Sequence, residues 1–515
     1  MLQEKIIKVA RGEEKADLVI KNAKIVNVLS EEIHDGDVAI VNGRIAGVSN
    51  DYHGENEIDI NGAFLTPGFI DGHSHGWGLT PLQCGTGYDF LERWVLGLGL
   101  GVNIDPYLNA CYSAVKHIES GCTTMHHYHS TKNPAHLEGE IEQTVRGYRD
   151  AGIRFAFSLG VRDQNRLTYD DEKFLAGLPA HLRAQAAPAA SYDQKAIREE
   201  YFALFDRLYR KYNHEGCRVF FGPMAPQWCS DELLMDIQEK AGRYDHAPIH
   251  LHVLQTVLQK AYGEKKYGQS LVRHLHDIGL AADNVTYGHA IWLTEEDMEI
   301  MAGTGTSVTH HASCNLKMRN GIMPVINLLK AGVLVGIGLD DKGLNDDEDF
   351  IQELALIHKL HRVAGFDFDT PALTAEDVIK MGTVNAAKVT GFAGVAGVLE
   401  PGYKADLILV NLDRMTEPWV DPQVPLLDVF IHRAKGVDVD TMIIDGKMVM
   451  QNRNILTVNK AELFDEIRQS AARGVTPEQK KSFQFISELK PYIFAFYQDW
   501  LKRDYDPHYV FNSRV

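Results

Sequence analysis

The sequence lacks any long uncharged apolar run, although 45% of its 515 residues are hydrophobic. A helix that crosses a bilayer needs about 18 such residues in succession, and no segment of the sequence reaches that length. The opening residues, MLQEKIIKVARGEEK, also lack the apolar core of a signal peptide. We therefore expect a globular protein that neither contacts a membrane nor is exported.

Basic residues and cysteine are scarce as well. Lysine and arginine number 52 against 70 aspartate and glutamate residues, which gives a net charge of -18. Binding to nucleic acid needs a basic face, so this balance argues against such a partner. The six cysteines include no C-x-x-C pair. In a long chain without an export signal they are expected to be reduced thiols, which predicts a cytoplasmic protein.

What the sequence does contain is two kinds of strand pattern. β-branched stretches with Asn-Gly and Asp-Gly turns fill residues 1–65 and return at 396–460, which predicts one small β-sandwich built from both chain ends. Across residues 66–395, short apolar runs alternate with stretches of helical period. The runs are GFIDGHSH, TTMHHYH, RFAFSLG, RVFFGP, IHLHVL, NVTYGHA, TSVTHH and VLVGIGLDD. Eight buried strands that alternate with helices predict an α/β fold, the parallel (β/α)8 TIM barrel.

The last segment, residues 461–515, is predicted to be a helical extension rich in aromatic residues. Its Phe, Tyr and Trp side chains are more typical of packing than of a binding site. An isolated extension of this kind would expose too much apolar surface. We therefore predict that the protein is a homo-oligomer that covers it.

Histidine and aspartate follow the ends of several predicted barrel strands, where barrel enzymes place their chemistry. These residues are His73, His75, His250, His252, His289, Asp340 and Asp341. Residues i and i+2 of a strand share a face, so His73 and His75 can point together into the barrel mouth. Imidazole and carboxylate groups suit Zn2+ or Fe2+, with one coordination position left for water. A lone H-x-H pair is a weak signal, but four such strand ends together predict a metal site.

The sequence resembles the amidohydrolase superfamily over nearly its whole length. TPGFIDGHSH at 66–75 resembles the first-strand signature, and HVLQ at 252–255 resembles the strand-five H-x-x-E pattern of the aminohydrolase and chlorohydrolase branch, which includes triazine hydrolases. Residues 222–234 and 287–341 resemble strand four and strands six to eight of that branch. The N-terminal ADLVIKNAKIVNV also resembles the opening of prokaryotic adenine deaminases. The resemblance implies a barrel with a split sandwich, in agreement with the strand pattern.

The resemblance also implies roles for individual residues. The metal ligands would be His73, His75, His252 and Asp340. Asp340 would in addition accept the water proton, His289 would contact the attacking water or the substrate, and Asp341 would project to the opposite side. Binuclear members carry a bridging lysine or glutamate on strand three or four, and RFAFSLG and RVFFGPMAP contain neither. One divalent ion per chain is therefore expected, with Zn2+ preferred over Fe2+.

Gln255 departs from the family pattern. Deaminases of this branch use a glutamate there to move a proton between water and a ring nitrogen. A glutamine still forms hydrogen bonds but does not titrate. Either another group supplies the acid, for which His127, His310 and His311 are candidates, or the substrate needs no ring protonation, as with an amide, urea or carbamate. We favour the second interpretation slightly.

The candidate substrate-binding residues are Trp77, Gln83, Met224, Trp228, His127 and His311. Aromatic and thioether side chains suit a partly apolar organic substrate. The predicted function is a metal-dependent hydrolase that cleaves a C–N bond, other than a peptide bond, in a small molecule. The alternatives are a deaminase or dechlorinase of an N-heterocycle, a binuclear cyclic-amide hydrolase, and a non-catalytic scaffold of the same fold.

Overall fold

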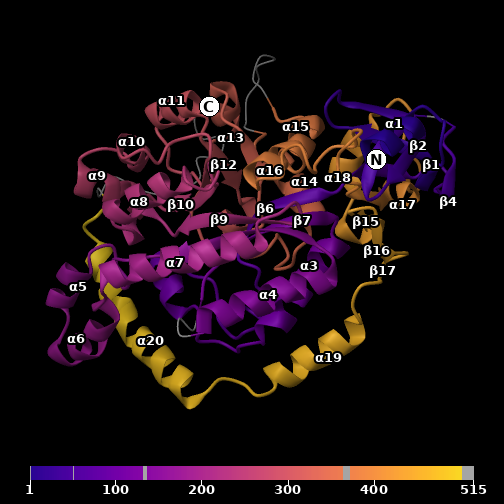
Figure 1. Cartoon of the computed structure of the whole chain (residues 1–515). Helices are drawn as coiled ribbons and strands as arrows, with labels where there is room; N and C mark the ends of the chain where they lie inside the picture. The colour runs from indigo at the N-terminus through magenta and orange to yellow at the C-terminus, as the bar shows by residue number, and fades with distance from the viewer. Residues whose placement is uncertain (1, 50, 132–135, 363–371, 502–515) are drawn as a thin grey trace.

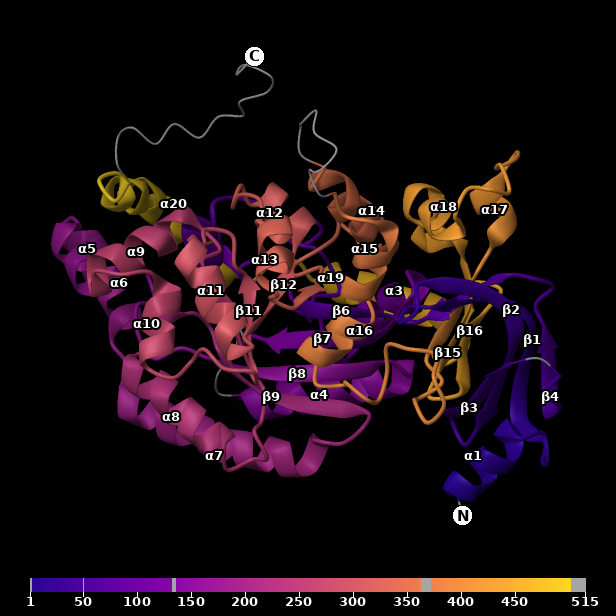
Figure 2. The same cartoon turned by 90° about the horizontal axis from the view of Figure 1, so that it is seen from above.

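The strands of the computed structural model, which describes residues 2–49, 51–131, 136–362 and 372–501, form two sheets. One has eight strands and the other has nine. Helices surround the eight-stranded sheet, and the nine-stranded sheet lies to one side of it together with the N-terminal helix α1 (Leu2–Ala10) (Figure 1, Figure 2).

The eight-stranded sheet is a parallel barrel. Its strands are β6 (Phe69–Ser74), β7 (Cys122–His129), β8 (Arg154–Val161), β9 (Cys217–Pro223), β10 (Ile249–Val253), β11 (Val285–His289), β12 (Ser307–His310) and β13 (Val335–Ile337). Two backbone hydrogen bonds join the first strand to the segment after the last one. Asp340 N donates to His73 O at 2.7 Å, and His75 N donates to Asp340 O at 3.1 Å. The predicted TIM barrel is confirmed, and residues of the predicted metal site close it.

Helices cover the outside of the barrel and connect its strands. They include α3 (Pro106–Glu119), α4 (Leu137–Ala151), α7 (Gln194–Tyr212), α8 (Asp231–Ala241), α9 (Val257–Tyr267), α10 (Leu271–Asp277), α11 (Glu295–Thr304), α13 (Val325–Ala331), α14 (Phe350–Leu360), α15 (Ala375–Met381) and α16 (Val384–Val389). Ser230 caps α8 and Thr256 caps α9, each by accepting a backbone N–H of the first turn. These caps fix the ends of the loops that carry Trp228 and Gln255.

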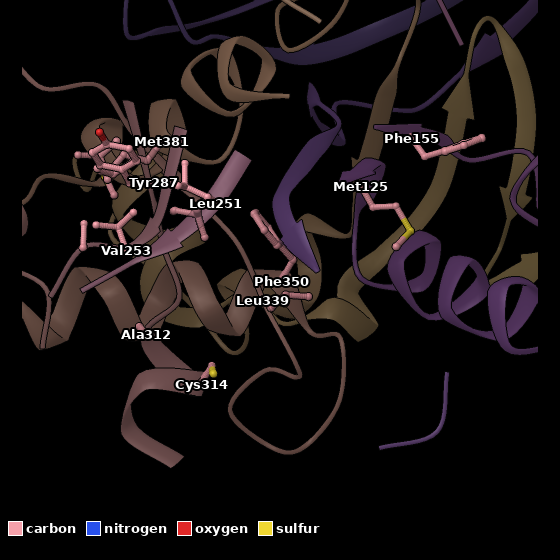
Figure 3. Packing of buried hydrophobic residues seen from close by; sticks show 14 of the residues in the cluster. Met125, Phe155, Leu251, Val253, Tyr287, Ala312, Cys314, Leu339, Phe350 and Met381 are labelled. Atoms are coloured by element: carbon pink, nitrogen blue, oxygen red, sulfur yellow. The ribbon is translucent and has the colours of Figure 1, made fainter. Parts of the chain in front are cut away.

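The core lies between the barrel and its helices. On β10, Leu251 and Val253 alternate with His250 and His252, so the apolar side chains face the helices while the imidazoles face the interior. Figure 3 shows Leu251 and Val253 near Tyr287 of β11, in the same cluster of buried residues. This alternation allows one strand to contribute to both the core and the site.

The nine-stranded sheet uses both parts of the chain that flank the barrel. Its strands are β1 (Ala16–Asn27), β2 (Glu32–Val41), β3 (Arg44–Ser49), β4 (Gly54–Asp59), β5 (Phe64–Pro67), β14 (Leu407–Val410), β15 (Val439–Ile444), β16 (Lys447–Gln451) and β17 (Asn454–Ile455). The two parts meet where β5 pairs with β14 in antiparallel register. Ile20, Ile40, Leu65 and Leu407 belong to its core. Helices α17 (Leu412–Thr416) and α18 (Leu426–Arg433) connect β14 to β15. The small β-domain from both chain ends is therefore confirmed.

Two helices, α19 (Lys460–Ala471) and α20 (Pro477–Tyr497), follow the nine-stranded sheet. Leu463 and Ile467 of α19 pack against Cys111 and Val115 of α3. Helix α20 lies next to α5 (Asp171–Gly177) and α6 (Ala180–Ala186), on the side of the barrel away from the nine-stranded sheet (Figure 1). The predicted extension is helical here, while its residues 502–515 lie outside the described residues. Among the described helices, none combines the length and apolar character needed to cross a bilayer.

Candidate metal centre and substrate cavity

The residues predicted to bind metal lie together at the carboxyl ends of the barrel strands. One ligand atom from each of His73, His75, His252 and Asp340 lies within 4.8 Å of the others. Asp340 Oδ1 is 3.2 Å from Nε2 of His75 and 3.4 Å from Nε2 of His73. The four groups come from β6, β10 and the segment after β13, so the site requires the closed barrel.

The second oxygen of Asp340 faces another pair of histidines. Its Oδ2 is 3.4 Å from Nε2 of His289 and 3.5 Å from Nδ1 of His311. His289 ends β11, and His311 lies directly before α12 (Ala312–Lys317). A single carboxylate therefore stands at the centre of five imidazoles from four strand ends.

Several nitrogens of this cluster have no hydrogen-bond partner among the described residues. These buried atoms are Nε2 of His73, Nε2 of His289 and Nδ1 of His311. A buried polar atom without a partner is costly, and native proteins leave few of them. Convergent imidazole and carboxylate groups of this kind fit a divalent cation. The donor set is thus consistent with a metal ion.

In His75, His252 and His289, the ring nitrogen Nδ1 forms a hydrogen bond with another part of the protein. Nδ1 of His75 donates to the Tyr128 carbonyl at 3.1 Å, and Nδ1 of His252 donates to the Met224 carbonyl at 2.8 Å. Nδ1 of His289 is 2.9 Å from the side-chain oxygen of Asn315. Such bonds fix the tautomer and turn the lone pair of the other nitrogen toward the centre.

Burial sets the electrostatics of the cluster. It lowers the pKa of His252 to about 4, so this imidazole is neutral at physiological pH and keeps its lone pair. Burial alone would raise the pKa of Asp340, but the surrounding imidazoles, with His289 foremost, hold that pKa well below its usual range. Burial likewise lowers the pKa of His73 and of His289. An ionised carboxylate beside these neutral imidazoles has the protonation states that metal binding needs.

Two of these residues adopt a backbone conformation that is unusual for side chains other than glycine. Asp340 has a φ of 58° and His289 a φ of 72°. Such strain is concentrated at functional sites. At Asp340 it also interrupts the alternation of the strand, so that Asp340 and Asp341 both line the same cavity. The prediction that Asp341 projects to the opposite side is wrong for this reason.

A cavity of about 410 Å³ opens in front of the cluster. Four residues of the predicted site line it together with His75, His252, His289 and Asp340, namely Trp77, Met224, Trp228 and Gln255. Gln255 is buried, and its backbone N–H donates to the side-chain oxygen of Gln259 at 2.7 Å. The cavity thus joins an aromatic wall to the candidate metal centre.

Three other predicted residues lie elsewhere. Gln83 is exposed, because its side-chain oxygen accepts the backbone N–H of Thr80 at 3.0 Å in a local turn. His127 lines a second cavity beside the first, and its Nδ1 is 2.6 Å from the Tyr148 hydroxyl. His311 belongs to the imidazole cluster rather than to the cavity wall. Gln83 lines neither of the two cavities, and its role as a substrate contact stays a prediction.

Sequence reasoning missed part of the cavity wall. Leu91, Trp94, Val95, Leu98 and Leu100 line it from the loop after β6, together with Arg162, Cys314 and Met318. Arg162 directly follows the apolar run of β8, and that position at the carboxyl end of a barrel strand could have indicated it. Its guanidinium forms no hydrogen bond or ion pair with the described residues. Burial, and then its neighbour Arg166, lower the pKa of Arg162.

Comparison with known proteins agrees with this geometry. The sequence model of the amidohydrolase family matches residues 64–449. A 5'-deoxyadenosine deaminase of Methanosarcina acetivorans is 29% identical over 469 residues, which cover 88% of this chain and 98% of that protein. A 5-methylthioadenosine/S-adenosylhomocysteine deaminase of Thermococcus kodakarensis is 29% identical over 451 residues, which cover 84% of this chain and 94% of that protein.

Solved structures share the fold. An adenosine deaminase of Xanthomonas campestris with bound zinc superimposes with a TM-score of 0.74 at 24% identity, covering 89% of this chain and 99% of that one. A mutant of the atrazine chlorohydrolase of Arthrobacter aurescens, complexed with zinc and atraton, gives a TM-score of 0.76 at 21% identity, covering 88% and 99%.

Proposed function

The chain belongs to the amidohydrolase family and is a metal-dependent hydrolase of C–N bonds other than peptide bonds, and we propose that it deaminates an N-heterocycle. The observation that carries this proposal is the aromatic cavity that opens onto a carboxylate surrounded by imidazoles. Trp77 and Trp228 can bury the faces of a planar ring. The relatives named as deaminases of adenine nucleosides support a purine-like ring.

We propose His73, His75, His252 and Asp340 as ligands of one divalent ion per chain. When bound, such an ion supplies a Lewis acid that makes water a usable nucleophile near neutral pH. Zinc suits three imidazoles and a carboxylate, and both solved structures compared above contain zinc. Strands β8 and β9 contain no lysine or glutamate that would bridge a second ion.

Asp340 is proposed as the base that takes the proton of the attacking water. Its low pKa keeps it ionised, and its two oxygens face both histidine pairs. His289 presents a lone pair at Nε2 because its Nδ1–H is directed at Asn315. It can therefore accept a hydrogen bond from the water and orient it, rather than donate to the charge that develops on the ring.

Gln255 lines the cavity as a neutral group, so the proton for the ring must come from elsewhere. Of the three alternative acids, His311 belongs to the imidazole cluster around Asp340. His127 lines the neighbouring cavity, and Nε2 of His310 is 2.9 Å from Nε2 of His361. Gln255 also keeps a second candidate function open. An amide, urea or carbamate needs no ring protonation and would use the same centre.

Metal analysis and a substrate screen test this proposal. Metal-loaded protein should release ammonia from an aminated purine nucleoside, and His252→Ala should lose both bound metal and activity. The exposed His246 provides the control, because His246→Ala should change neither. Full metal occupancy in His252→Ala would remove that residue from the ligand set. Hydrolysis of ureas or amides without deamination of any heterocycle would favour the second candidate function.

We further propose a cytoplasmic enzyme that acts as a homo-oligomer on a small molecule. Five cysteines, Cys111, Cys122, Cys217, Cys229 and Cys314, are buried free thiols, which suits a reducing compartment. Phe483 and Phe494 of α20 are 48% and 59% exposed, which supports self-association through that helix.

A further inference from the structure

We infer that the C-terminal helix α20 holds one wall of the substrate cavity in place and thereby contributes to substrate selection. This inference deepens the proposed function and depends on it only for the location of the substrate. It concerns a wall that belongs to no barrel strand and a helix that lies outside the family match.

The wall in question is the segment 91–100. It contains α2 (Leu91–Trp94) and the short 3-10 helix η1 (Val95–Gly97), and it lines the same cavity as the metal cluster. Beyond η1 the sequence continues as a run of alternating glycine and leucine, and Gly99 has a φ of 84°. Glycine gives a segment conformational freedom rather than rigidity. The wall therefore depends on contacts with other elements for its shape.

The first contact comes from the start of α20. The side-chain nitrogen of Gln479 donates to the carbonyl of Gly101 at 2.8 Å and to that of Gly99 at 3.3 Å. The side-chain oxygen of Gln479 accepts the backbone N–H of Thr476 at 2.7 Å, as part of the capping box of the helix. The cap orients the Gln479 amide, so its nitrogen is directed at the glycine carbonyls.

The second contact lies at the other end of α20. The backbone N–H of Tyr169 donates to the hydroxyl of Tyr497 at 2.9 Å, and the hydroxyl of Tyr169 donates to the Glu92 carboxylate at 2.8 Å. The same oxygen of Glu92 accepts the hydroxyl of Thr256 at 2.5 Å. Thr256 follows Gln255 directly. A buried chain of hydrogen bonds thus runs from α20 through the wall to the loop that carries a cavity residue.

Helix α20 lies outside the part of the chain that the family model matches. That match ends at residue 449, before α19 and α20 begin. An element beyond the matched residues therefore contributes to the shape of the cavity through its contacts with the segment 91–101.

Gln479→Glu tests the first contact without disturbing the helix cap. The glutamate keeps the oxygen that accepts the Thr476 N–H, loses both donated bonds and places a carboxylate beside two carbonyls. Tyr497→Phe tests the second contact, because it keeps the packed ring and removes only the hydroxyl. Gln484→Glu is the matched control, since Gln484 is exposed on the same helix.

The double variant, Gln479→Glu with Tyr497→Phe, should have a KM for the nucleoside substrate that is roughly tenfold higher or more. That is the loss expected for one or two hydrogen bonds. The value of kcat for a small aminated ring that does not reach the wall should stay unchanged, as should bound metal. Hydrogen exchange of residues 91–101 should become faster in the double variant and stay at the wild-type rate in Gln484→Glu. The exchange measurement needs no substrate, so it tests the inference even if deamination is not found. Unchanged exchange in the double variant would overturn the inference, as would unchanged KM where a nucleoside is turned over.

Discussion

At the residue scale, the strained backbone of Asp340 brings two adjacent carboxylates to one cavity. A continued strand would have turned Asp341 away, but the φ of 58° at Asp340 interrupts the alternation. Both oxygens of the Asp341 side chain are buried without a hydrogen-bond partner among the described residues, and the Lys317 ammonium lies 3.5 Å from one of them. Asp341 therefore adds a second carboxyl group to the cavity wall beside the group proposed as the base, and burial raises the pKa of Asp341.

Gln255→Glu tests whether proton transfer to the ring limits the reaction. If the native substrate needs no ring protonation at this position, the new charge lies near an anionic nucleophile and kcat/KM should fall about tenfold or more, since each 1.36 kcal/mol is tenfold. Comparing kcat/KM of the two forms on the identified substrate is the measurement. A clear gain in the glutamate variant would show that the missing acid limits the native reaction.

Arg162→Met tests whether the unpaired guanidinium serves binding at the expense of stability. Arginine stays charged at any ordinary pH, and burial and Arg166 both disfavour that charge in the folded protein. Methionine fills similar space without a charge, so the free energy of unfolding should rise by about 1 kcal/mol while catalytic efficiency falls. The melting temperature and kcat/KM of the variant test the two expected changes. Arg162→Lys is the control, because it retains the charge. A lower melting temperature in Arg162→Met would show that the guanidinium is stabilising.

At the scale of elements, the sequence predicts the strands better than the loops between them. The eight apolar runs predict the barrel because a strand buried on both faces must be apolar, and H-x-H spacing predicts which imidazoles share a face. The wall at 91–100 has no such periodicity. Its place depends on Gln479, which lies 380 residues beyond Gly99. Pairwise contacts at that separation leave no local pattern in one sequence, so this part of the site could not be predicted.

Helix α14 carries a buried carboxyl group whose titration should be visible in the stability of the protein. Glu353 accepts the backbone N–H of Ser313 at 2.9 Å and also contacts the Ser313 hydroxyl. Burial, only partly offset by these bonds, raises the pKa of Glu353 to about 7. Because the unfolded carboxyl has its ordinary lower pKa, the folded state binds more protons between the two values. The stability associated with this group therefore falls as pH rises from about 4.3 toward 7.

Glu353→Gln should remove that dependence, since glutamine resembles the protonated acid and can still bond to Ser313. Relative to wild type, the variant should gain up to about 4 kcal/mol above pH 7 and nothing below the unfolded pKa of about 4.3. Denaturant unfolding at several pH values measures the difference. An offset that is the same at every pH would assign the effect to packing rather than to titration.

At the scale of the whole molecule, the chain ends do more than enclose the barrel. The N-terminal and C-terminal strands form one sheet, and the final helices then run back around the barrel to the side where α5 and α6 lie (Figure 1). The strand pattern and the family resemblance both predicted the first arrangement. The second lies outside the family match, and amphipathic helical patterns indicate that a helix packs without indicating where it packs.

The outer side of α20 provides the last prediction. Phe483 and Phe494 are exposed and eleven residues apart, about three helical turns, so they lie on one side of the helix. If a second copy of the chain covers them, Phe483→Ser with Phe494→Ser should shift the protein to a monomer in light scattering or sedimentation experiments. KM should not change, because neither side chain lines the cavity.

Deleting residues 477–515 provides the comparison, since it should change assembly and, by releasing the wall at 91–100, raise KM as well. A wild-type chain that is monomeric at micromolar concentration would contradict the predicted oligomer and leave the role of Gln479 and Tyr497 untouched. A double serine variant with raised KM would instead mean that the partner subunit presses α20 against the cavity wall. In that case assembly and substrate selection would be coupled through this helix.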